Sequence, residues 1–418
     1  MASPINPQSI TVEEPDDLPA YVSNGLIGLR VLTRPLTPAT TIVSGLSGRH
    51  PVAQVEAAAR APYPLAGDIQ LNGAWMSDLP GHVTFKSQSY DFSCGELRTE
   101  FEFRVDGVTA RIEVLTFCSR REPTIVTQQV TIRTSEPAAV TLRAAVSPDG
   151  VPGEWLRRET ATPGEPKPEV DGSLLWGTLG NLSQVGIAYA TELVGNAQAD
   201  LVRQEWGEET PLASDYRFRT RSGRAVRLRQ LSSLVPSVMH AQPDRQAVRL
   251  AARARELGWD FLRADNRAAW DELWRGRITL VGADLRWQEL TDAAFFYLNS
   301  SVHAASPSST SIFGLAQWHN YHYYYGPRDV GRGHVRRPTP LIAAAGGSKR
   351  AYRVPDAQPP GRQEQREPSW PQRLPVPVGG EHVTRGRSRA GRREGIVVRG
   401  PRHARCGHGV HLVLAHHR

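Results

Sequence analysis

The sequence predicts a mainly β fold with a smaller α-helical part: an antiparallel β-sandwich, then helices, then a tail that we expect to be disordered. Three observations carry this prediction. Residues 1 to about 240 are predicted to form strands, and in residues 97–146 apolar and polar residues alternate with a period of two. From Asp244 the apolar residues recur at helical spacing. From Pro327 the chain becomes rich in arginine and proline and has few apolar positions.

The strands are clearest between residues 97 and 146. In residues 97–105 apolar residues alternate with Arg and Glu, as in a half-buried strand. Asp106-Gly107 suits a two-residue hairpin turn, because such turns need positive φ, and residues 108–114 continue the alternation. Further strands are predicted at residues 126–132 and 140–146. Successive antiparallel strands with one solvated face indicate a sandwich.

Three helices are predicted after the strands. The first takes Asp244 as its N-cap and ends before Gly258, and the second begins near Ala264. One apolar face of the second helix is formed by Trp270, Leu273 and Trp274. We expect this face to pack a linker helix, the alternative being a platform for a sugar ring. The third helix is predicted over residues 285–305, with its apolar stripe on Leu290, Ala294, Tyr297 and Leu298.

Two segments resemble glycoside hydrolase family 65. Asn24-Gly25-Leu26-Ile27-Gly28-Leu29-Arg30 has the Asn-Gly-x-x-Gly-x-Arg pattern that opens the family's N-terminal domain. We interpret Asn24 and Arg30 as structural supports of this domain. The alternative is that they lie near the family's active site. In residues 311–326, Gly314-Leu315, Trp318, Tyr324 and Gly326 resemble the entry to the family's catalytic barrel. The likeness covers about residues 15–326.

The resemblance implies an N-terminal β-sandwich domain at residues 1–240, a helical linker at 241–284 and the first segment of an (α/α)6 catalytic barrel at 285–326. It also implies inverting cleavage of α-linked glucosides of the trehalose, maltose or kojibiose type, by hydrolysis or by phosphorolysis with inorganic phosphate. The residues placed to contact the sugar are Asn320, Tyr324 and Tyr325. No catalytic residue, metal ligand or cofactor is expected in this chain, because the family's catalytic carboxylates come later in the barrel.

The barrel pattern stops at Gly326, where we predict a break in the reading frame. Residues 327–333 can be encoded by codons that, read one base later, give His-Val-Met-Trp-Asp-Val, the family's expected His-x-x-Trp-Asp run. Residues 353–380 can be shifted in the same way into a segment containing Phe-Pro-Trp-Glu, which also looks like the family. Residues 327–418 are therefore predicted to be an out-of-frame tail, the alternative being a genuine but unusual one.

The basic charge of the chain belongs to this tail. Residues 327–418 contain 19 of the 50 Lys and Arg residues but 6 of the 42 Asp and Glu residues, so their net charge is +13 against −5 for residues 1–326. Such a tail could bind nucleic acid, but it has no interleaved aromatics and we do not expect it to. In the tail, Cys406, His408 and His411 have a spacing that would suit a metal, although three such ligands in a coil are weak evidence.

We predict a cytoplasmic protein without a membrane partner. The sequence has three cysteines, shows no signal-peptide pattern and contains no apolar run long enough to span a membrane. Two further outcomes stay open. The sandwich could act as a carbohydrate-binding or interaction module. Apolar surface at Phe295, Phe296 and Tyr297 could promote aggregation if it faced an absent barrel.

Overall fold

The computed structural model describes residues 9–15, 21–52, 54–161, 169–195, 198–203 and 212–308. All of them belong to one compact unit, Met1–Ala344. The predicted sugar contacts Asn320, Tyr324 and Tyr325 and the predicted tail at 327–418 lie outside the described residues. The frame break, the barrel segment beyond residue 308 and the domain boundaries therefore stay predictions.

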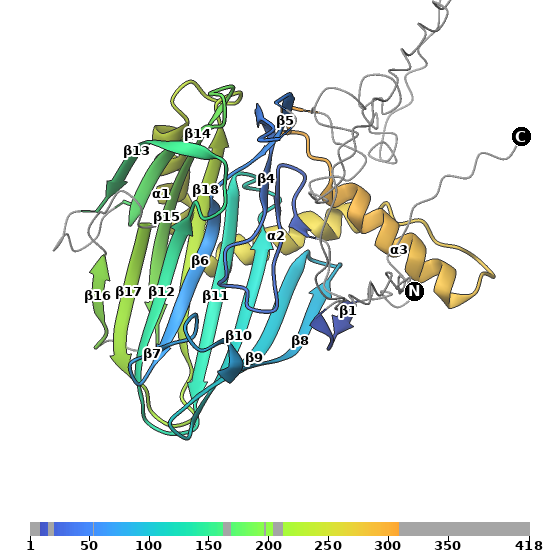
Figure 1. Cartoon of the computed structure of the whole chain (residues 1–418). Coiled ribbons are helices and arrows are strands. Elements are labelled where there is room, and N and C mark those ends of the chain that lie inside the picture. Colours follow the sequence, from blue (N-terminus) through green and yellow to red (C-terminus); the bar gives the residue numbers. More distant parts are fainter. Residues whose placement is uncertain are drawn as a thin grey trace, which may run out of the picture. The chain divides into compact units, whose positions relative to one another are not determined.

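The described residues form three sheets, in which all paired strands are antiparallel (Figure 1). The nine-stranded sheet has the order β1 (Ser9–Val12), β8 (Val83–Asp91), β9 (Glu96–Val105), β10 (Val108–Cys118), β11 (Ile125–Thr134), β18 (Val226–Pro236), β15 (Gln184–Val194), β14 (Gly172–Thr178) and β13 (Gly153–Thr160). The five-stranded sheet has the order β16 (Asp200–Arg203), β17 (Leu212–Arg219), β12 (Ala139–Ser147), β6 (Tyr63–Leu71) and β7 (Ala74–Trp75). A small sheet contains β2 (Val22–Ser23), β3 (Ile27–Leu29), β4 (Thr41–Arg49) and β5 (Glu56–Arg60). A 3-10 turn, η2 (Pro80–His82), precedes β8.

The predicted hairpin is confirmed. Val105 pairs with Val108 across the turn, and Asp106 and Gly107 have φ values of 50° and 79°, as a two-residue turn with positive φ at both positions requires. The predicted third strand follows as β11 on the far side of β10. The fourth, β12, leaves this sheet and joins the five-stranded one.

The two large sheets face each other across an apolar core. The five-stranded sheet contributes Ile69, Leu142 and Tyr216 to it, and the nine-stranded sheet contributes Phe101 and Ile112. These residues alternate with more polar ones along their strands, so this face of each sheet is buried between the two sheets. The predicted antiparallel β-sandwich followed by helices is confirmed.

Helix α1 (Pro243–Leu257) covers the outer face of β15 and β18 with a row of alanines. Its N-cap is Gln242, so the prediction of Asp244 as N-cap was wrong. Pro243 takes the first helical position, where its missing N–H costs nothing and its fixed φ suits the helix. Asp244 instead accepts a hydrogen bond of 2.6 Å from Arg157 of β13.

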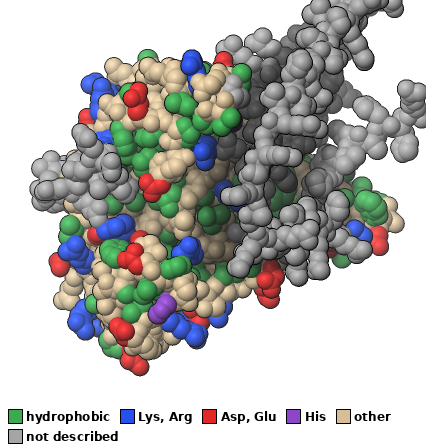
Figure 2. All heavy atoms as spheres, viewed as in Figure 1, with side chains coloured by type: hydrophobic (Ala, Val, Ile, Leu, Met, Phe, Trp, Pro, Cys, Tyr) green, Lys and Arg blue, Asp and Glu red, His purple; other side chains and the backbone are tan. Residues whose placement is uncertain are grey.

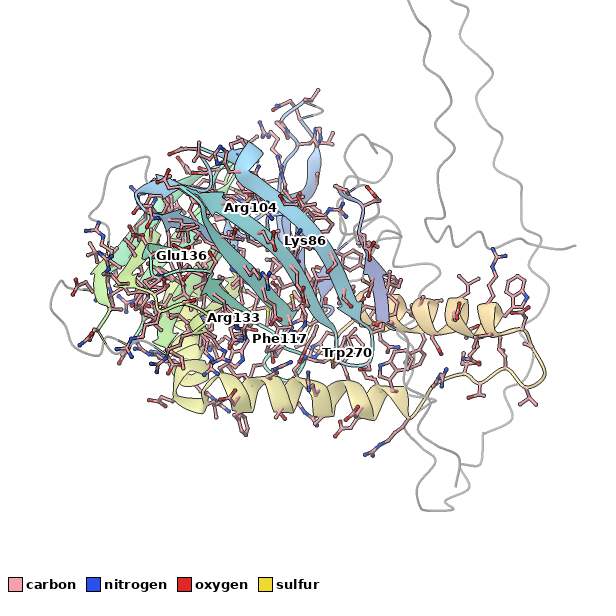
Figure 3. All side chains as sticks on the ribbon, turned by 90° about the horizontal axis from the view of Figure 1, so that it is seen from below. Lys86, Arg104, Phe117, Arg133, Glu136 and Trp270 are labelled. Carbon is pink, nitrogen blue, oxygen red and sulfur yellow. The ribbon has the colours of Figure 1, made fainter. Side chains whose placement is uncertain are left out.

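Helix α2 (Trp259–Trp274) begins directly after Gly258, five residues before the predicted start. It is attached to β9 by Glu96, a buried carboxylate with two arginine partners on the helix. Glu96 Oε1 accepts from Nε of Arg263 at 2.9 Å and of Arg267 at 2.7 Å, and Oε2 accepts from their Nη2 atoms, each at 2.8 Å. In Figure 3, Phe117 and Trp270 lie on the side of α2 that faces the strands.

Helix α3 (Leu285–Ser300) ends five residues earlier than predicted, and its buried face differs from the predicted stripe. Leu290 and Leu298 of that stripe are 40% and 63% exposed, whereas Phe296 is fully buried. The tertiary partners of α3, rather than its own periodicity, select the inward face. Phe296 is thus not the exposed apolar surface that was expected. Among the described residues no helix is long and apolar enough to cross a membrane.

Candidate functional site at the sandwich–helix junction

The N-terminal signature segment meets the end of α3 at a buried junction, which we define as residues 21–28, the loop 119–124 and residues 296–306. Asn24 is fully buried within it. Its Nδ2 donates to the carbonyls of Ser119 at 2.6 Å and Pro123 at 2.8 Å. Its Oδ1 accepts from the backbone N–H groups of Leu26 at 3.0 Å and Ile27 at 2.9 Å. Two donors and two lone pairs are thus all used, so Asn24 is a structural group.

Arg120 connects the sandwich to α3 through its guanidinium. Nη1 donates to the carbonyls of Asn24 at 3.0 Å and Asn299 at 2.6 Å, and Nη2 donates to the carbonyl of Val302 at 3.1 Å. The guanidinium carbon lies 5.1 Å from the centre of the Trp270 ring. Burial lowers the pKa of Arg120 to about 10, so the group stays charged at neutral pH.

The backbone of Arg120 is held from both sides. Its N–H donates to Asn266 Oδ1 at 3.0 Å, and its carbonyl lies 3.0 Å from His303 Nε2. Because the Ala305 N–H donates to His303 Nδ1 at 3.0 Å, Nε2 is the atom that carries the proton and donates. Burial, followed by the charge of Arg120, lowers the pKa of His303, which favours this neutral tautomer.

Gly25 lets the two segments approach each other. Its φ is +91°, and a Cβ at this position would come within 2.3 Å of the carbonyl carbon of Val302. Beside it, Ser23 Oγ donates to the carbonyl of Ser300 at 2.7 Å, and the hydroxyls of Tyr21 and Ser301 are 2.8 Å apart. The first glycine of the signature is therefore required by close packing.

Aromatic rings fill the space beneath this contact. Phe296 stacks on Phe92 with centroids 4.6 Å apart, meets Tyr90 edge-on at 5.2 Å and lies 4.8 Å from Trp270. Trp274 Nε1 donates to the carbonyl of Phe92 at 2.9 Å. Trp270 is fully buried, so it packs α2 and α3 against the sandwich and offers no platform to a sugar.

The junction fixes the chain just after α3, a few residues before the aromatic segment 311–326 in the sequence. Sequence reasoning identified Asn24 but missed Arg120, Asn266 and His303. Arg120 is followed directly by Arg121 in a polar segment typical of an exposed loop, and nothing in the local sequence distinguishes the two arginines. Arg30, the other signature residue, is partly buried, and burial lowers its pKa.

Two hollows occur elsewhere on the described surface. One, of about 360 Å³, lies between β15, β18 and the turn from α1 to α2. Its carboxylates, Glu192 and Asp260, both contact Arg229, at 3.5 Å and 3.3 Å. The other, of about 690 Å³, lies on the outer face of the five-stranded sheet. Two carboxylates line it, Asp200 and Asp215, and Asp215 is held by both Nε and Nη2 of Arg143.

A catalytic acid needs a carboxyl that is free to hold and release a proton at neutral pH. The carboxylates of Glu192, Asp260 and Asp215 instead balance guanidinium charges. Burial raises the pKa of Asp68, but its carboxylate accepts the backbone N–H groups of Ile69 and Ser77. Among the described residues no group of three or more His, Cys, Asp or Glu side chains is placed to hold a metal ion.

Comparison with known protein families identifies one family for this chain. The family model of the glycosyl hydrolase family 65 N-terminal domain matches residues 20–273. No curated protein sequence matches the chain. The match covers the sandwich from β2 to β18, helix α1 and α2 up to its next-to-last residue, including the signature segment and Arg120.

Among solved structures, a protein described as a kojibiose phosphorylase from the human microbiome has a TM-score of 0.59 at 12% identity. The match covers 74% of this chain and 44% of that protein, so this chain corresponds to less than half of it. A heparinase III gene product gives a TM-score of 0.22 at 10% identity, over 34% of this chain and 19% of that one. The first likeness supports the fold, and the second carries no argument.

Proposed function

The chain belongs to glycosyl hydrolase family 65 through its N-terminal domain, and from this premise we propose that it is a protein of carbohydrate metabolism which is inactive as written. It supplies the β-sandwich and the helix-docking junction of such an enzyme. The partner class is an α-linked glucoside, with inorganic phosphate as the second substrate if intact relatives act by phosphorolysis. The description of the similar structure as a kojibiose phosphorylase supports this class.

Inversion at an α-glucoside needs a carboxylic acid that protonates the leaving oxygen. In a hydrolase it also needs a carboxylate that activates water from the opposite face. In the hollows of the sandwich, Glu192, Asp260 and Asp215 are bound to arginines, and none of the six carboxylates in residues 327–418 lies in a motif that resembles the family's. Loss of a general acid alone removes about 10² to 10⁴ in rate.

The observation that carries the proposal is the end of the family-like pattern at Gly326. Up to that residue the sequence resembles the entry of the barrel, and the junction holds the preceding helix in place. After it, the barrel-like pattern continues only when the codons are read one base later. A sugar pocket built on Asn320, Tyr324 and Tyr325 would then be incomplete.

The test is a comparison of two proteins made from the same gene. The purified chain is incubated with kojibiose, maltose and trehalose, each with and without phosphate, and glucose and glucose 1-phosphate are measured. We expect no product above the buffer control. A second protein, made after one base is removed in codon 327, should cleave one of the three sugars. Turnover by the chain as written, lost on Glu381→Gln or another substitution of a tail carboxylate, would contradict the proposal.

A further inference from the structure

The outer face of the five-stranded sheet carries two rows of mostly polar side chains, the first across all five strands and the second across four. In the first row, neighbouring strands place Trp75, Gln70, Thr141, Arg217 and Asp200 opposite one another in register. In the second row the register partners are Asp68, Arg143, Asp215 and Val202. Residues two apart on a strand share a face, so the two rows are adjacent. The intervening residues, such as Ile69 and Leu142, point into the core.

The first row, together with Arg143 and Asp215 of the second, lines the groove of about 690 Å³. Trp75 is half-buried beside it, with the Arg143 guanidinium 4.3 Å from its ring centre. Thr141 Oγ1 donates to Gln70 Oε1 at 2.9 Å, and Gln70 Nε2 donates to the carbonyl of Gly73 at 3.0 Å. The groove therefore combines an indole with an amide, a hydroxyl and a fixed guanidinium, in an arrangement that the sheet itself keeps rigid.

The charges of the groove select against ionic partners. Arg143 binds Asp215 through two hydrogen bonds of 2.7 and 2.8 Å, and Arg217 lies opposite Asp200. Arg143 and Arg217 thus each have a negative neighbour, and Figure 2 shows acidic and basic side chains interspersed over this side of the molecule. A polyanion such as nucleic acid needs a field of one sign, which this face does not provide.

A polyhydroxylated, uncharged ligand fits this surface best. Sugar hydroxyls both donate and accept, so they suit a row in which donors and acceptors alternate. The C–H face of a sugar ring packs against an indole ring. We propose that the outer face of the five-stranded sheet binds a neutral oligosaccharide across strands β7, β6, β12 and β17. The proposal rests on the proposed carbohydrate function only for the ligand class, since binding here requires no catalytic barrel.

The test titrates the full chain with maltohexaose and with cellohexaose, followed by isothermal calorimetry and by tryptophan fluorescence. Trp75→Ala should weaken binding by at least about tenfold, as expected for a central aromatic contact. Trp287→Ala is the matched control, because Trp287 is 59% exposed on α3, and it should leave affinity unchanged. Arg217→Ala, an exposed position that does not endanger folding, should weaken binding about two- to tenfold.

Binding that is the same in the wild type, Trp75→Ala and Arg217→Ala variants would overturn the proposal, as would a wild-type chain that binds neither hexasaccharide at millimolar concentration. Preference for a sulfated dextran over both neutral sugars would also overturn it, because the ligand would then be an anion. Catalytic inactivity of the same protein bears only on the proposed function, so the two outcomes are distinguishable.

Discussion

Replacing Glu96 by Gln should weaken the attachment of α2 to the sandwich and lower the free energy of unfolding. Glu96 accepts four hydrogen bonds from Arg263 and Arg267, and its side chain is only 5% exposed. Gln keeps one acceptor oxygen but turns an amide NH₂ toward two guanidinium groups, so about two of the four bonds are lost. At about 1.5 kcal/mol for each charged bond this gives about 3 kcal/mol. Because the two arginines are 28% and 47% exposed and regain water, we expect about 2–3 kcal/mol.

The control is Glu113→Gln, which changes the same groups at the surface. Glu113 pairs with Arg98 at 2.6 Å, but the two side chains are 30% and 41% exposed, so the loss should stay at or below about 1 kcal/mol. The assay is urea unfolding of both variants, followed by circular dichroism at pH 7. An equal loss of unfolding free energy in the two variants would refute the reasoning.

The same experiment has a pH dependence of known sign. Burial raises the pKa of Glu96, but hydrogen bonds from Arg263 and Arg267 outweigh it, so the net pKa is lowered. A carboxyl with a lowered folded pKa stabilises the protein fully above its unfolded pKa of about 4.3 and loses this contribution as the pH falls through the folded pKa. The difference between wild type and Glu96→Gln should therefore be largest at neutral pH and shrink below about pH 4. A difference that stays constant down to pH 3 would show that packing, not charge, causes the loss.

Other parts of the structure give further expectations. Asn24→Ala leaves two buried carbonyls without donors and should cost about 2–4 kcal/mol in urea unfolding; a loss below 1 kcal/mol would mean that water replaces the amide. Gly25→Ala meets both a positive φ and the backbone of Val302, so it should lower the melting temperature by several degrees, about 2 kcal/mol or more, and an unchanged melting curve would contradict the contact. Burial raises the pKa of Cys94 to about 12 and also raises that of Cys118, so neither thiol should react with iodoacetamide at pH 8 in the folded chain, as checked by mass spectrometry of their peptides with and without urea.

Much of the sandwich could be predicted because its signals are local. Structure is determined within a few residues by the alternation in residues 97–114 and by the Asp106-Gly107 turn. Together they set the register of β9 against β10. The start of α2 could not be predicted in the same way. Gly258 was read as an interruption, whereas its N–H closes α1 on Ala254 and its carbonyl accepts from Leu262 in α2. One glycine serves both helix ends, which only the arrangement in space reveals.

The buried face of α3 and the junction depend on distant partners. Phe296 turns inward because Phe92 and Trp270 are there to receive it, and these lie more than 25 positions away in the sequence. Arg120 has its structural role because its guanidinium donates to three carbonyls from other segments. The sugar contacts Asn320, Tyr324 and Tyr325 stay predictions, since they lie outside the described residues.

The central claim is that the enzyme-like pattern is interrupted after Gly326, and the nucleotide sequence around codon 326 tests it most directly. The account predicts that the DNA from codon 327 onward, read one base later, encodes His-x-x-Trp-Asp and further downstream Phe-Pro-Trp-Glu. A coding sequence in which that frame contains neither motif, or soon meets a stop codon, would contradict it.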